Sequence, residues 1–165
     1  MAGLPTWEEV RALMLAPKPP LACTAFGLGR GGQVRVLFDG AETWFLEDDG
    51  RVELRASDER SMLDGDDGLR RTDGVHVHSF GWVKSAIEPR RLGSLQDADG
   101  AVTGREDAGG RPCLVVEASG LKREGGAPFR LWVDEETGVI LRMVRIDDPA
   151  PLLVLYGLRV GTIAP

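Results

Sequence analysis

Residues 128–143, PFRLWVDEETGVILRM, carry the strongest structural signal in this chain. Two apolar runs flank an acidic turn that ends at Gly138, and glycine supplies the backbone freedom that such a turn needs. The pattern predicts a β-hairpin with its turn at residues 134–138. Side chains alternate along a strand, so six apolar residues share one face of this hairpin. They pair as Phe129 with Met143, Leu131 with Leu141, and Val133 with Val139. This apolar face requires a covering layer.

Further strands are predicted on both sides of the hairpin, because apolar residues alternate with polar ones between turn signals. They span residues 33–39, 43–47, 51–56, 74–80, 102–106, 112–118 and 152–160. Residues 58–73 are acidic and contain glycine, which predicts a loop with room for one helical turn at 61–63. The strands follow one another instead of alternating with helices, so the sheet is expected to be antiparallel.

One amphipathic helix is predicted near the start of the chain. Thr6 and Glu9 form a capping box, in which each side chain can bond to the backbone of the other residue. Apolar residues then recur at helical spacing, and Pro17 ends the helix. These apolar residues are Trp7, Val10, Leu13 and Met14. A second, short helix is expected at residues 89–95.

The bulk properties indicate a single globular domain of 165 residues with an ordinary apolar content of 42%. A net charge of -6 argues against nucleic acid as a partner. We find no signal peptide and no run of roughly 20 apolar residues, so we expect a cytoplasmic protein without a transmembrane segment. In that compartment Cys23 and Cys113 are expected to be free and buried.

Three local motifs have a chemical and a structural interpretation. Residues 27–32 fit the G-x-G-x-x-G pattern, but they precede a strand instead of a helix, which favours a turn. The acidic residues 64–68 lack the glutamate that closes a calcium loop. His76 and His78 share one face of a predicted strand and could supply two metal ligands, but nothing in the sequence indicates a third. We therefore expect no metal and no cofactor, and no residue set indicates catalysis.

Aromatic residues cluster in the predicted sheet, where they either fill a core or line an apolar cavity. The candidate ligand contacts are Trp7, Trp44, Trp82, Phe129 and Trp132.

Several short motifs resemble the LolA-like lipoprotein-carrier superfamily, which includes LolA, RseB and LppX-type lipid carriers. Residues 131–142 resemble its "LWVD-x-x-TG-x-x-LR" hairpin, and residues 88–92 with 102–116 resemble its "P-x-x-L … GR-x-x-x-x-V" run. Asp39-Gly40 with Trp44 is similar to its "DG … W" hairpin, and residues 155–160 fit its closing strand. The resemblance covers residues 30–163, with the helix of residues 1–17 preceding them.

The resemblance implies an α+β fold: a curved antiparallel half-barrel of roughly 8–10 strands with one or two covering helices and an apolar cavity between them. Its members bind acyl chains, lipoproteins or lipids and are not enzymes. They are exported, whereas this chain shows no export signal. The leading hypothesis is a non-enzymatic protein that holds a lipid or acyl chain in that cavity. The alternative is a protein-interaction module that uses the sheet edge or the first helix.

Overall fold

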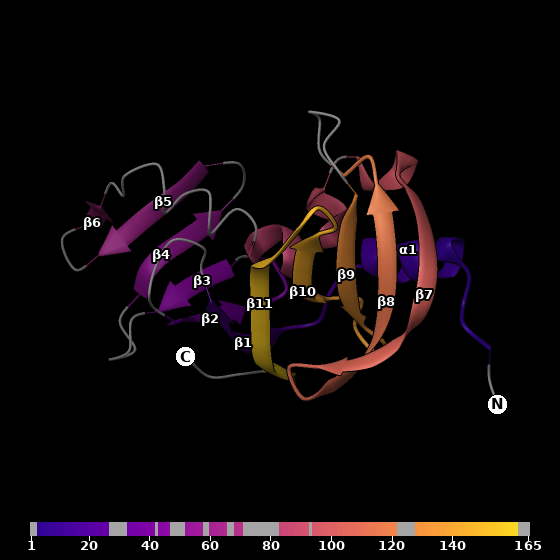
Figure 1. Cartoon of the computed structure of the whole chain (residues 1–165). Helices are drawn as coiled ribbons and strands as arrows, with labels where there is room; N and C mark the ends of the chain where they lie inside the picture. Colours follow the sequence, from indigo (N-terminus) through magenta and orange to yellow (C-terminus); the bar gives the residue numbers. More distant parts are fainter. Residues whose placement is uncertain are drawn as a thin grey trace.

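The computed structural model describes residues 3–26, 33–41, 43–46, 52–57, 60–65, 68–70, 83–92, 94–121 and 128–161. Within these ranges eleven strands form one antiparallel sheet, in the order β6-β5-β4-β3-β2-β1-β11-β10-β9-β8-β7 (Figure 1). The sheet is curved and unclosed and carries few helices, which confirms the predicted α+β half-barrel.

Two meanders make up this sheet. The first contains β1 (Leu21–Phe26), β2 (Gln33–Phe38), β3 (Thr43–Leu46), β4 (Val52–Ser57), β5 (Arg60–Gly65) and β6 (Gly68–Arg70). The second contains β7 (Asp99–Ala108), β8 (Arg111–Ser119), β9 (Phe129–Asp134), β10 (Ile140–Arg145) and β11 (Asp148–Val160). They join where β1 pairs with β11, Leu21 lying opposite Val160. The outermost strands of the sheet are therefore β6 and β7.

The predicted strands at residues 33–39, 43–47, 51–56, 102–106, 112–118 and 152–160 are present, and the strand predicted at 74–80 lies outside the described residues. The prediction of a loop at 58–73 is wrong, because β5 and β6 lie there. In β5, Met62 pairs with Arg55 and Arg60 with Ser57. Neighbouring strands supply these backbone hydrogen bonds, so an acidic, glycine-containing composition does not reveal them. Strand β1 was not predicted either, because LACTAF shows no polar alternation.

Helix α1 (Trp7–Leu15) begins and ends as predicted. Glu9 N donates to Thr6 Oγ1 at 3.2 Å and Thr6 N donates to Glu9 Oε2 at 2.7 Å, which confirms the capping box. Residues 83–87 are also helical, and the short helix expected at 89–95 consists of two 3₁₀ turns, η1 (Pro89–Arg91) and η2 (Leu95–Asp97). No helix in the described ranges is long and apolar enough to cross a membrane.

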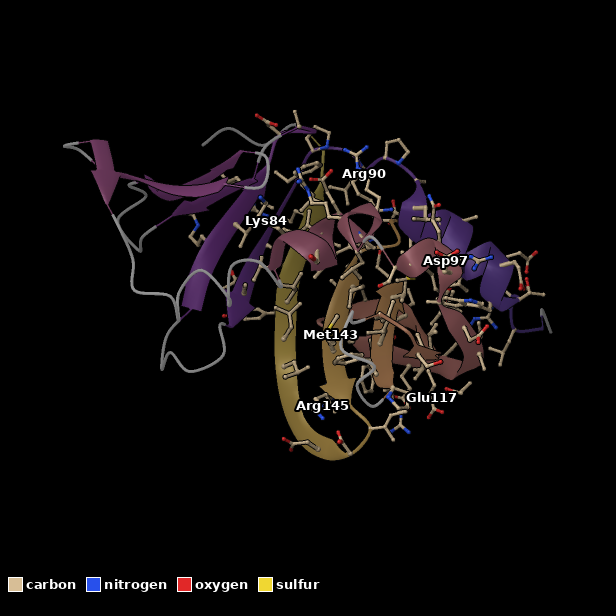
Figure 2. All side chains as sticks on the ribbon, turned by 90° about the horizontal axis from the view of Figure 1, so that it is seen from above. Lys84, Arg90, Asp97, Glu117, Met143 and Arg145 are labelled. Atoms are coloured by element: carbon tan, nitrogen blue, oxygen red, sulfur yellow. The ribbon has the colours of Figure 1, made fainter. Side chains whose placement is uncertain are left out.

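The helices lie along one side of strands β8 to β11 (Figure 2). We call this side the helix face; it carries Leu114, Val116, Phe129, Leu131 and Val133, all of which are buried. Helix α1 contributes Trp7, Val10 and Met14 to the same core. The covering layer that the apolar hairpin requires is thus present.

The predicted register of the β9–β10 hairpin is wrong. Val133 pairs with Ile140 instead of Val139, and Leu131 pairs with Met143 instead of Leu141. The turn is shifted by one residue, because β9 continues through Asp134 and β10 begins at Ile140, and Asp134 N donates to Val139 O at 2.8 Å. An irregularity between Ile140 and Arg142 then shifts the pairing again, so that Phe129 lies opposite Arg145.

The β7–β8 hairpin extends beyond the β9–β10 turn and curves toward β11 (Figure 1). At its tip, a Cβ atom built on Gly109 would lie 2.8 Å from the carbonyl oxygen of Leu155 in β11. The end of the outermost hairpin therefore contacts the strand at the centre of the sheet. The second meander is thus curved enough to bring its outer hairpin against β11.

Candidate functional site

An open pocket with a volume of about 530 Å³ lies on the helix face, between α1 and β8. Its apolar wall comes from the N-terminal segment, α1 and β8: Leu4, Pro5, Val10, Leu13 and Leu114. Leu4 is 46% exposed, and Leu13 is half-buried. An open pocket with this lining suits one apolar group that arrives from outside.

The rim of this pocket is polar. Arg105 Nε in β7 donates to Glu135 Oε1 in the β9–β10 turn at 2.7 Å, and Arg105 Nη2 lies 3.4 Å from Gly3 O. Glu9 completes the rim. Because Arg105 and Glu135 neutralise each other, Glu9 leaves the rim with a negative charge.

The buried carboxylate of Asp134 holds the turn that carries Glu135. It accepts hydrogen bonds from Thr137 N at 2.9 Å, from Thr137 Oγ1 at 2.7 Å and from Arg111 Nε at 2.6 Å. Burial opposes ionisation, but the bonds from Arg111 and Thr137 outweigh it and keep the pKa of Asp134 below its usual value. In addition, Glu135 N donates to Pro112 O at 3.1 Å, which fixes the turn against β8.

Three of the predicted contact residues, Trp7, Phe129 and Trp132, lie in the described part of the structure, and none of them lines this pocket. Trp7 packs on Gly100 and donates from Nε1 to Ala98 O at 3.0 Å, so it belongs to the core under α1. Phe129 is also in the core and is only 2% exposed. The Trp44 side chain, Trp82, His76 and His78 lie outside the described part of the structure.

Trp132 points to the face of the sheet opposite Phe129. Its Nε1 donates to Glu106 Oε2 at 2.9 Å, and the guanidinium of Arg142 lies over its ring at 4.7 Å. Trp132 is 7% exposed, so neighbouring strands and Arg142 cover most of the ring. Trp132 and Phe129 therefore cannot bind the same small ligand.

Sequence reasoning missed Arg105, Leu114 and Glu135 as pocket residues. Leu13 belongs to the apolar stripe of the first helix, which was the local signal for a contact surface there, and it remains half-buried. The other three come from separate strands and turns, and only the sheet pairing brings them together.

A second group of charges lies between the end of α1 and the helical residues 83–91. Glu88 is 1% exposed and binds Arg90 Nη2 at 2.7 Å and Arg91 Nε at 2.8 Å. Lys18 Nζ donates to Leu13 O at 2.7 Å. Burial, and then the charge of Arg90, lower the pKa of Lys18 to about 8, although Glu88 acts in the opposite direction. Figure 2 marks Arg90 and Lys84, which is also buried, in this helical layer.

The described residues show no reactive centre. Cys23 and Cys113 are free and buried, as predicted, and burial raises the pKa of each thiol to about 12. Thiols with such pKa values are poor nucleophiles. A search of the same ranges finds no group of three His, Cys, Asp or Glu residues suited to a metal ion.

No protein-family model and no curated protein sequence matches this chain. Among solved structures it is similar to MucB, with 18% identity and a TM-score of 0.60 over 96% of this chain and 59% of that one. It is also similar to the Pseudomonas aeruginosa MucA/MucB complex, with 18% identity and a TM-score of 0.55 over 96% of this chain and 57% of that one. For the Mycobacterium tuberculosis lipoprotein LppX, the identity is 11% and the TM-score is 0.46, over 94% of this chain and 98% of that one. The chain has a MucB-like fold and spans about 59% of the MucB chain.

Proposed function

We propose that this chain is a non-enzymatic binding module that recognises a protein partner through the pocket between α1 and β8. The observation that carries the proposal is the pocket itself, which is open and combines an apolar wall with a charged rim formed by Glu9, Arg105 and Glu135. A single apolar side chain of a partner fits such a site, and the rim contributes specificity.

The packing beneath α1 supports a protein partner over an enclosed small ligand. Val10, Met14 and Leu131 are at most 1% exposed, so the described part of the space between helix and sheet is filled by the protein's own side chains. MucB, which shares the fold, forms a complex with MucA. A binding role of the same kind is our proposal for this chain.

The second candidate is the apolar ligand expected from the sequence, a lipid or acyl chain. The apolar side chains of the pocket, Leu4, Pro5, Val10, Leu13 and Leu114, favour this candidate. An acyl chain in an open pocket would keep part of its surface in water, which weakens its binding.

Photo-crosslinking from the pocket separates the two candidates. We would place p-benzoylphenylalanine at Leu13, inside the pocket, and at Ala12, an exposed neighbour on α1, in cells that make the protein. The proposal predicts a defined protein adduct from position 13 that is absent from position 12. A lipid adduct at position 13 would support the second candidate. Identical adducts at both positions, or none, would contradict both.

A further inference from the structure

Among the described strands, β7 is at the edge of the sheet and pairs only with β8. Its hairpin closes with a two-residue turn at Gly109 and Gly110, both at positive φ, so the flanking Ala108 and Arg111 form a hydrogen-bonded pair. Hydrogen-bonded and non-hydrogen-bonded pairs alternate along the hairpin, so Asp107 and Arg105 both occupy non-hydrogen-bonded positions. Their backbone N–H and C=O groups therefore point away from β8. These groups are the ones that an added strand would bind.

The acidic side chains of β7 have no cationic partner in the part of the chain that the structure describes. Asp99, Glu106 and Asp107 make no ion pair with any described residue. Carboxylates elsewhere in the second meander are paired: Glu117 with Arg130, Asp134 and Glu136 with Arg111, and Asp147 with Arg145. Since Glu135 neutralises Arg105, the free edge carries an uncompensated negative charge.

This charge argues against a second copy of the chain as the occupant. Pairing β7 with another β7 would bring two sets of the same three carboxylates close together, and like charges on paired strands are destabilising. The same charge attracts a strand that carries Lys or Arg.

The pocket adds a second requirement. Arg105 forms part of its wall, and its side chain lies on the helix face, as does Leu114 opposite it. Cross-strand partners share a face, so a residue added opposite Arg105 would also project on the pocket side.

We propose that the β7 edge and the neighbouring pocket bind an extended protein segment by strand addition. The segment carries a large apolar residue opposite Arg105 and a Lys or Arg residue close to it, opposite Glu106 or Asp107. This inference rests on the proposed function and specifies the chemistry of the partner. Backbone hydrogen bonds provide the affinity, and the apolar and basic side chains provide the specificity.

The test starts with random peptides as long as β7, ten residues, displayed on phage and selected on the full chain. Enriched peptides should combine a large apolar residue with Lys or Arg and avoid Asp and Glu. Binding to Asp107→Pro should fall at least about fivefold, the value of one backbone hydrogen bond, because proline removes the outward N–H. Asp107→Asn keeps this N–H and removes the charge, so its peptide affinity should fall less than that of Asp107→Pro. Asp147→Asn, in a turn away from β7, serves as the control.

The inference is wrong if no peptide is enriched, if the enriched peptides lack basic residues, or if they bind Asp107→Pro as well as the original chain. Leu13→Glu tests the pocket separately. Loss of binding in Leu13→Glu, with full binding in Asp107→Pro, would overturn strand addition while the proposed function stands. Should Asp107→Pro not fold, slowed amide hydrogen exchange of Arg105 and Asp107 in the peptide complex would confirm strand addition. Unchanged exchange would refute it.

Discussion

Among single residues, Asp134 has the largest expected effect on the turn beside the pocket. Its folded pKa lies below the usual value of 3.8, mainly because Arg111 and Thr137 outweigh the effect of burial. A carboxyl group with a lowered folded pKa contributes stability that is present above the unfolded pKa. This contribution is lost as the pH falls through the folded value.

We therefore expect Asp134→Asn to lower the free energy of unfolding by about 2 kcal/mol at neutral pH, since Arg111 loses its buried anion. The difference from the original chain should shrink in acid, where protonation removes the same charge. Urea denaturation across this range measures it. Glu136→Gln is the control: Glu136 binds the same Arg111 but is 71% exposed, and its loss should cost under about 0.5 kcal/mol. Equal losses in both variants at every pH would contradict the assigned role of Asp134.

Lys18 also makes stability rise with pH, but in an alkaline window, because burial disfavours its charged form. Burial and the charge of Arg90 lower its pKa from 10.5 to about 8, against the effect of Glu88. Between these two values Lys18 binds more protons in the unfolded chain than in the folded chain, so its contribution to stability should rise with pH in that window, while the two buried thiols make the opposite contribution with or without Lys18. In Lys18→Met, which keeps an apolar side chain of similar length, this rise should be absent. Denaturant midpoints of both proteins at several pH values from 8 to 10.5 provide the measurement. Parallel profiles would show that Lys18 keeps an ordinary pKa.

For the individual elements, sequence patterns predicted what could be read locally. The capping box and apolar stripe of α1 lie within ten residues, and the strands of the second meander alternate clearly. The register of β9–β10 could not be predicted, because it depends on where β9 ends in the turn and on an irregularity between Ile140 and Arg142, which only the pairing of the two strands reveals. Strands β5 and β6 were missed for a related reason, since their hydrogen bonds come from neighbouring strands.

The contact between α1 and β7 gives a prediction with a control in the same strand. A Cβ atom on Gly100 would lie 2.6 Å from the Trp7 ring, whereas one on Gly104 would meet nothing within 4 Å. Gly100→Ala should therefore lower the free energy of unfolding by about 1–3 kcal/mol, because the ring must move within a packed core. Gly104→Ala should be neutral or slightly stabilising. Thermal denaturation compares the two. A Gly104→Ala variant as unstable as Gly100→Ala would mean that α1 does not pack on β7 as described.

For the whole molecule, the run of consecutive strands predicted an antiparallel sheet, and the resemblance of short motifs to the LolA-like superfamily implied that this sheet curves into a half-barrel. The pocket was not predictable, because its residues come from α1, β7, β8 and the β9–β10 turn. Aromatic content indicated a cavity, but Trp7 fills the core and Trp132 lies on the other face. Composition identifies residues that prefer burial, and only the fold determines whether they line a pocket or fill it.

We expect the contact between the β7–β8 tip and β11 to hold the second meander in its curved form. Gly109 and Gly110 both have positive φ, at 57° and 81°, so alanine is strained at either position. Only Gly109 also lies against β11, where its added Cβ would be 2.8 Å from Leu155 O; at Gly110 nothing lies within 4 Å.

Gly109→Ala should therefore lower the free energy of unfolding by about 1–2 kcal/mol more than Gly110→Ala, because backbone strain is common to both variants and the clash belongs to one. Amide hydrogen exchange at Leu155 and Tyr156 should accelerate in Gly109→Ala alone, since the tip must withdraw from β11. Equal destabilisation of the two variants, with unchanged exchange in β11, would show that the tip does not hold the half-barrel in its curved form.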